Sequence, residues 1–130
     1  MLAVTHALVG GLVATKIPNP FVSYPLLFAS HLFLDLIPHW DFGREFKKRK
    51  RTVNFFLGSL DFTLGIGLCW LIFQRSFPFN PLLWGGVFFS LLPDFLEFPI
   101  LFLEWKVPPF DKLELICSKI FHRQAKFPQG

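Results

Sequence analysis

The sequence has few cysteines and none of the short motifs that identify common hydrolytic enzymes. Of its two cysteines, Cys69 lies within an apolar stretch and Cys117 near the carboxyl end, which favours reduced thiols that bind no metal over a structural disulfide. A glycine-rich phosphate loop, a Gly-x-Ser-x-Gly turn and a His-Glu-x-x-His helix are all missing. Nucleotide hydrolysis, serine acyl transfer and a zincin protease therefore have no motif to support them.

The amino terminus lacks a basic region and a small-residue cleavage site. Its apolar start carries His6, so no removable signal peptide is expected. Internal repeats and low-complexity linkers are also missing. The sequence predicts a single integral membrane domain over residues 1–130.

Apolar residues are abundant. They make up 52% of the 130 residues, and 19 phenylalanines and four tryptophans stand against one tyrosine. The mean hydropathy is positive. A soluble domain of this length would expose too much apolar surface, so the composition favours a membrane protein over a phenylalanine-rich soluble core.

Four apolar stretches predict an all-α fold, a small transmembrane bundle of about four helices with a carboxyl-terminal interfacial helix. The stretches cover about residues 2–15, 21–38, 53–74 and 80–103, and an amphipathic tail covers about 110–123. A bilayer core needs about 20 helical residues, so the first two stretches predict a tilted or incompletely spanning hairpin. Pro93 and Pro99 should kink or break the fourth.

The distribution of positive charge predicts a topology. Residues 47–51 are all basic and lie between two apolar stretches, which indicates a cytoplasmic loop in preference to a nucleic-acid patch. The tail is basic as well, whereas the two opposite loops carry only Lys16 and Arg75. We expect a multi-pass protein of the inner cell membrane with both termini in the cytoplasm, the lipid bilayer as its partner and no nucleic acid. The oligomeric state is not indicated.

Ionisable residues inside apolar segments are the candidates for function, because each costs roughly 3 kcal/mol on membrane insertion. Every segment carries at least one, and the topology places them all in the cytoplasmic half. His31 and Asp35 are four residues apart and share one helix face, as do Asp94 and Glu97 at a spacing of three. The predicted metal ligands are His6, His31, Asp35, His39, Asp41, Asp94, Glu97 and His122.

Imidazole nitrogen and carboxylate oxygen together suit zinc first, with manganese or iron as alternatives and room for one or two ions. Buried histidines and carboxylates can instead pair with one another or with backbone carbonyls, and this alternative stays open, most of all for His6. Asp61 and Glu97 are the candidate catalytic bases. Asp61 lies about 13 Å below the inner surface at 1.5 Å per residue, and its other possible role is to orient a histidine.

At these residues the chain resembles the membrane-bound metal-dependent hydrolases, a bacterial and archaeal family related to zinc-dependent phospholipase C in its ligand patterns. Four pieces carry the resemblance: Thr5-His6-Ala7, His31 to Asp35, Leu91 to Asp94, and Phe121-His122-Arg123. The Leu-Leu-Pro-Asp piece follows the His-x-x-x-Asp piece here, the reverse of the family's usual order, and the second histidine after the His-Arg segment is absent. The resemblance implies a compact, rearranged member in which these residues bind metal.

The expected chemistry is hydrolysis at the cytoplasmic face, because a bound ion would lower the pKa of water to about 7 and polarise a phosphoryl or acyl oxygen. The depth of the residues favours a phosphoester or lipid-like small-molecule substrate. The rival interpretation is a non-enzymatic membrane protein that transports metal or protons, or a structural subunit whose polar cluster fixes helix packing.

Overall fold

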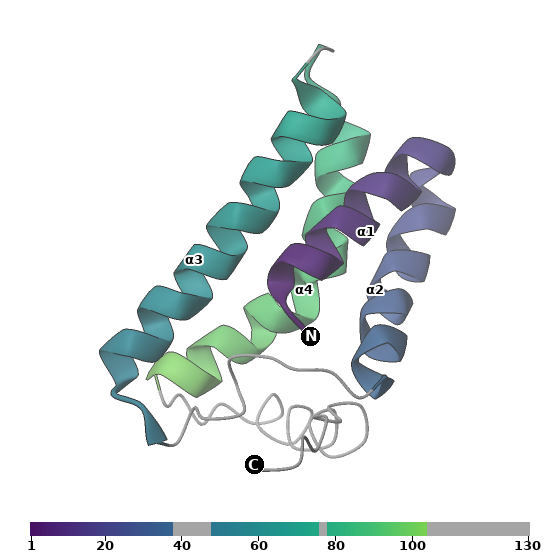
Figure 1. Cartoon of the computed structure of the whole chain (residues 1–130). Helices are drawn as coiled ribbons and strands as arrows, with labels where there is room; N and C mark the ends of the chain where they lie inside the picture. The colour runs from purple at the N-terminus through teal and green to yellow at the C-terminus, as the bar shows by residue number, and fades with distance from the viewer. Residues whose placement is uncertain (38–47, 76–77, 104–130) are drawn as a thin grey trace.

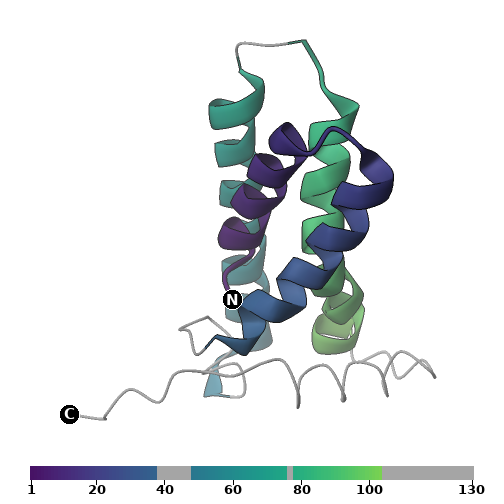
Figure 2. The same cartoon turned by 90° about the vertical axis from the view of Figure 1, so that its right-hand side faces the viewer.

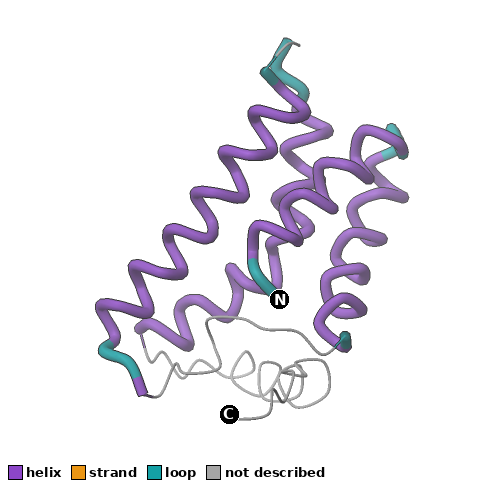
Figure 3. Tube along the Cα trace, viewed as in Figure 1, coloured by secondary structure: helices purple, strands orange, loops and turns teal. Residues whose placement is uncertain are grey.

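The computed structural model describes residues 1–37, 48–75 and 78–103, and all regular structure within these ranges is helical (Figures 1 and 3). The elements are α1 (Ala3–Lys16), α2 (Pro20–Leu36), α3 (Arg51–Cys69), a short π-helix η2 (Trp70–Gln74) that continues α3, and α4 (Pro81–Leu103). The predicted all-α fold with four helices is confirmed for these residues. The expected tail helix at about 110–123 lies outside them.

Two Asn-Pro pairs set the starts of α2 and α4. The side chain of Asn19 accepts a hydrogen bond from Phe21 N at 3.0 Å, and that of Asn80 accepts from Leu82 N at 3.0 Å. A proline follows each asparagine, at the first helical position, where its missing N–H costs nothing. Local sequence therefore explains both helix starts.

Prolines inside the helices do not end them. Pro25 lies within α2, and α4 continues through both Pro93 and Pro99. The carboxyl-terminal part of α4 turns toward the start of α3 (Figure 1). The fourth helix is thus bent and unbroken.

α1 lies at the centre of the bundle and packs against α4, α3 and α2 (Figures 1 and 2). Its contact with α4 is unusually close. A Cβ on Gly10 would lie 2.8 Å from Ser90 Cβ, and one on Gly86 would lie 2.5 Å from Ala14 Cβ. Small residues let the two backbones approach, which is how helices commonly associate in lipid.

A small core fills the space between α1, α3 and α4. Its buried members are Ala3, Ala7, Cys69, Val87 and Leu91. The Cys69 thiol is free and donates a hydrogen bond to the Ala7 carbonyl at 3.1 Å. This agrees with the expected reduced state of Cys69, and Cys117 lies outside the described residues.

α3 carries large apolar side chains that the protein leaves exposed. Phe56 is 65% exposed, Leu64 53% and Ile72 59%. With its π segment the helix runs from Arg51 to Gln74, and only 11% of its most apolar stretch is buried. Among the described helices it is the one long and apolar enough to cross a membrane, by length and composition. The further crossings of the expected bundle stay predictions.

Candidate metal centre

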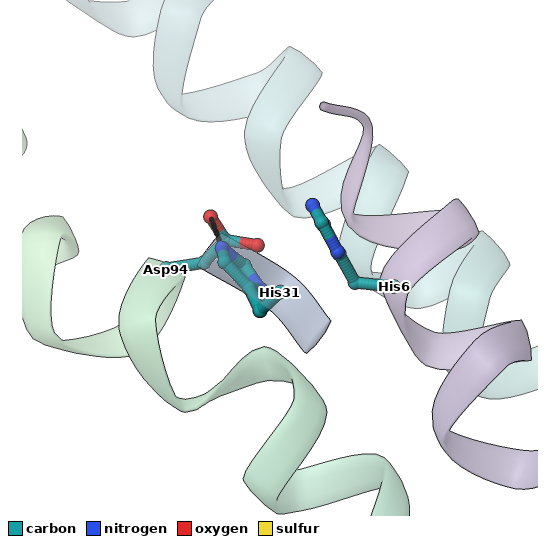
Figure 4. Close-up of side chains that lie close together, drawn as sticks. All are labelled: His6, His31 and Asp94. Atoms are coloured by element: carbon teal, nitrogen blue, oxygen red, sulfur yellow. Dashed lines mark ion pairs between the residues drawn. The ribbon is translucent and has the colours of Figure 1, made fainter. Parts of the chain in front are cut away.

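Three helices bring His6, His31 and Asp94 together (Figure 4). His6 comes from α1, His31 from α2 and Asp94 from α4. One ligand atom of each lies within 4.8 Å of the others, so the group could hold a metal ion. The two imidazoles are buried and stack with ring centroids 3.7 Å apart, whereas the Asp94 side chain is 25% exposed. The sequence prediction thus anticipated three residues that the fold places side by side.

Asp35 joins this group from α2, one turn after His31. Its Oδ1 lies 3.3 Å from His6 Nε2, and its Oδ2 lies 3.2 Å from His31 Nε2. The Met1 amino group donates a further hydrogen bond to Oδ1 at 2.5 Å. The Asp35 carboxylate is therefore placed between the two histidines, at the helical spacing that the sequence predicted.

The proton position on His31 follows from its partners. Its Nδ1 lies 2.7 Å from the Ser90 carbonyl oxygen, which can only accept, so Nδ1 carries the hydrogen. In a neutral ring Nε2 then holds a lone pair. That lone pair would face Asp35 Oδ2 at 3.2 Å and Asp94 Oδ1 at 3.5 Å, two further acceptors. A positive charge, either a proton or a metal ion, is needed between these atoms.

The remaining polar atoms also fit a cation. His6 Nδ1 and Asp94 Oδ2 are buried and have no hydrogen-bond partner among the described residues. Ligands bound to one zinc ion at about 2.1 Å lie about 3.4 Å apart. The group would have to contract by up to about 1.4 Å around an ion, which side-chain rotation can provide. Its nitrogen and oxygen donors suit zinc, manganese or iron.

Ser90 is a site residue that sequence reasoning missed. Its carbonyl oxygen accepts from His31, and its hydroxyl donates to the His6 carbonyl at 2.6 Å. One residue of α4 therefore orients one histidine and ties down the backbone of the other. The available signal was the small-residue spacing of Gly86 and Ser90 on one face of α4, which marks a close helix contact.

Asp61 binds backbone in this structure. Its Oδ2 accepts from Ala3 N at 2.7 Å and its Oδ1 from Val4 N at 3.2 Å. The residue before α1, Leu2, offers no side-chain cap, so Asp61 supplies from α3 what the local sequence lacks. The carboxylate thereby holds the start of α1, two residues before His6. Its predicted role as a catalytic base is not tested by this contact.

The other predicted residues are only partly placed. Glu97 lies half-buried on α4, three residues after Asp94, and is not a member of the three-residue group. His39, Asp41 and His122 fall outside the described residues, so their assignment as ligands stays a prediction. No family model, curated protein or solved structure matches the chain. The resemblance to metal-dependent hydrolases also stays a prediction.

Proposed function

We propose that this chain is a multi-pass membrane protein that binds a divalent metal ion, zinc in the first place, and hydrolyses a phosphoester of a lipid-like substrate at the cytoplasmic face. The observation that carries the proposal is the environment of His31. Its Nδ1 is committed to the Ser90 carbonyl, and its Nε2 faces two carboxylates. Metal-bound histidines characteristically donate their second ring N–H in this way.

Each residue of the group has a distinct part in the proposal. His6, His31 and Asp94 hold the ion, and Asp35 accepts from His6 Nε2 through Oδ1 and offers Oδ2, beside His31 Nε2, as a further ligand. Asp94 is the most exposed of the three, so a substrate would approach from its side. Glu97 lies one turn further along α4 and would accept the proton of the attacking water. The ion, when bound, would supply Lewis-acid chemistry to a phosphoryl oxygen.

The membrane placement is supported by α3 and by the basic residues before it. The exposed phenylalanines and leucines of α3 suit acyl chains, and Lys48 to Arg51 lie at its start, the end of the bundle near the amino terminus (Figure 1). The positive-inside rule assigns that end to the cytoplasm. Basic residues at the end of the bundle near the amino terminus would also attract an anionic phosphoester.

Metal analysis of detergent-purified protein tests the first half of the proposal. Wild type should carry at least one zinc per chain, and His31→Ala and Asp94→Ala should each lose it. Thr63→Ala is a matched control, because Thr63 is exposed on α3 and bonds only within its own helix, to Ser59. Equal metal content in all four proteins would refute the ligand assignment.

An enzyme assay tests the second half of the proposal, which is phosphoester hydrolysis. The purified protein should hydrolyse a phosphodiester presented in mixed micelles, lose the activity on chelation and regain it with zinc. Glu97→Gln should retain zinc and lose most of the activity, by about 10²–10⁴-fold for a lost general base. A Glu97→Gln protein that retains both zinc and full activity would remove Glu97 from the mechanism.

A non-enzymatic role is the second candidate, and one observation favours it. The contacts of Asp35 with His6 and of His31 with Asp94 join α1, α2 and α4 directly, so the polar group also fixes helix packing. This role predicts bound zinc and a higher unfolding temperature with zinc, but no phosphodiester hydrolysis. Zinc uptake into proteoliposomes would separate transport from a structural role.

A further inference from the structure

A second polar site lies at the end of the bundle away from the metal group. An open pocket of about 300 Å³ is lined by Trp70, Gln74, Arg75, Phe79 and Trp84. These residues come from the end of α3, its π segment and the start of α4, at the α3–α4 connection (Figure 1). The lining combines three aromatic rings and one amide with a single guanidinium, and it contains no acidic side chain.

The π-helix shapes this pocket. In an α-helix, residues five apart point about 140° away from each other around the axis. Here Arg75 N donates to the Trp70 carbonyl at 2.8 Å, the five-residue bond of a π turn. Arg75 therefore follows Trp70 by about one full turn and lies on the same side of the helix. Without the π segment, the cation would point away from the indole.

Gln74 fixes the part of the pocket formed by the α3–α4 connection and the start of α4. Its Nε2 donates to the Pro78 carbonyl at 2.7 Å, and its Oε1 accepts from Asn80 N at 3.0 Å and Trp84 Nε1 at 3.1 Å. The amide is buried, with 5% of the residue exposed. Because Gln74 and the Trp84 indole N–H bind each other, the guanidinium of Arg75 is the exposed cation that the pocket offers to a ligand.

The surroundings identify the kind of ligand. Trp70 is 49% exposed and Phe79 73%, and aromatic residues at the end of an apolar helix are typical of the boundary between lipid and water. A guanidinium binds phosphate oxygens in a bidentate manner. Exposed Leu71 and Ile72 continue from the pocket along the helix and would lie beside acyl chains.

We propose that this pocket binds the phosphate of an anionic phospholipid headgroup in the leaflet opposite the metal group. Arg75 binds the phosphate, the rings of Trp70 and Phe79 contact the glycerol and upper acyl region, and Gln74 holds the turn in shape. A volume of about 300 Å³ is at the lower end for ligand sites, which suits a headgroup and excludes most of the chains. The inference rests on the membrane placement of the proposed function and is independent of metal binding and hydrolysis.

Native mass spectrometry of detergent-released protein tests the site with phosphatidylglycerol and phosphatidylcholine as probes. Wild type should retain phosphatidylglycerol in preference to phosphatidylcholine. Arg75→Gln should reduce that preference roughly tenfold, the effect of one lost charge-assisted contact. Lys16→Gln is the matched control, because this substitution also removes one positive charge. Lys16 lies exposed at the end of α1 and does not line the pocket. It should retain the wild-type preference.

Three outcomes would overturn the inference. Equal losses in Arg75→Gln and Lys16→Gln would indicate general charge attraction. Equal retention of the two lipids by wild type would show that the pocket does not select an anionic headgroup. Displacement of the lipid by millimolar inorganic phosphate would indicate a site for soluble phosphate. Zinc content measured in the same samples reports on the metal group separately, so failure at one end is distinguishable from failure at the other. An unchanged unfolding temperature of lipid-free Arg75→Gln shows that the variant is folded.

Discussion

α1 and α3 are both apolar helices, yet they occupy opposite positions in the bundle. α1 has 14 residues, many of them alanine and glycine, and it packs against the three other helices. α3 with its π segment spans 24 residues, and most of its large side chains are exposed. In lipid, hydrophobicity does not drive one helix against another, whereas small residues and polar contacts do. The one candidate membrane span among the described helices is also the helix that packs least against the others.

The largest expected difference in the free energy of unfolding is between alanine variants of two leucines. Leu91 is 1% exposed in the core, and Leu64 is 53% exposed on α3. Leu91→Ala should lower the free energy of unfolding by about 2–5 kcal/mol, because it leaves a cavity. Leu64→Ala should change it by less than about 0.5 kcal/mol. Reversible unfolding in one detergent measures both, and similar losses would show that α3 is covered by protein.

The next largest loss of stability is expected at a glycine in the close contact between α1 and α4. Gly86→Ala places a Cβ 2.5 Å from Ala14 Cβ and should destabilise the bundle by about 1–3 kcal/mol through forced separation of α1 and α4. The same separation would move Ser90 from the His6 backbone, so zinc affinity should also fall. Wild-type stability and zinc content in this variant would contradict the close approach of the two helices.

Removing the Asp61 cap on α1 should lower the free energy of unfolding by somewhat less. Asp61→Ala deletes the acceptor of two backbone N–H groups and should destabilise by about 0.5–2 kcal/mol, whereas Asp61→Asn keeps one oxygen and should lose less. Both variants should retain zinc when folded. If Asp61→Asn has wild-type stability but no hydrolytic activity, a catalytic role is favoured over a purely positioning one.

The smallest expected effect has the opposite sign. A Cβ on Gly67 of α3 meets no atom within 4 Å. Gly67→Ala should therefore stabilise the protein by up to about 1 kcal/mol through helix propensity. The unfolding measurement used for Gly86→Ala checks it, and a clear destabilisation would reveal a neighbour packed against that face.

Much of the fold follows from local sequence. When η2 is counted with α3, each described helix begins and ends within two residues of the expected positions, because the apolar stretches are interrupted by Asn-Pro pairs and a basic run. The π segment was not predicted. It changes the register by one residue within an apolar run, and nothing in the composition of Trp70 to Gln74 marks that change.

The site was predictable in its charged members and not in their partners. His6, His31 and Asp94 were expected to meet because ionisable groups in apolar helices must face the interior. Ser90 orients His31 through a backbone carbonyl, which every residue possesses, so its small side chain indicates a close helix contact but not this hydrogen bond. The binding of Asp61 to Ala3 and Val4 depends on how α1 and α3 align, and that alignment is a tertiary property.

The cap that Asp61 places on α1 also sets an order of assembly. The first turn of α1 is separated from its acceptor by 58 residues of chain. At synthesis rates of about 5–20 residues per second, α1 precedes Asp61 by about 3–12 seconds. During that interval two backbone N–H groups of α1 lack the carboxylate, so water, or lipid headgroups in the proposed membrane placement, must solvate them. In the proposed membrane placement, the start of α1 would therefore stay near the membrane surface until α3 has inserted, and Asp61 would then complete the cap two residues before His6.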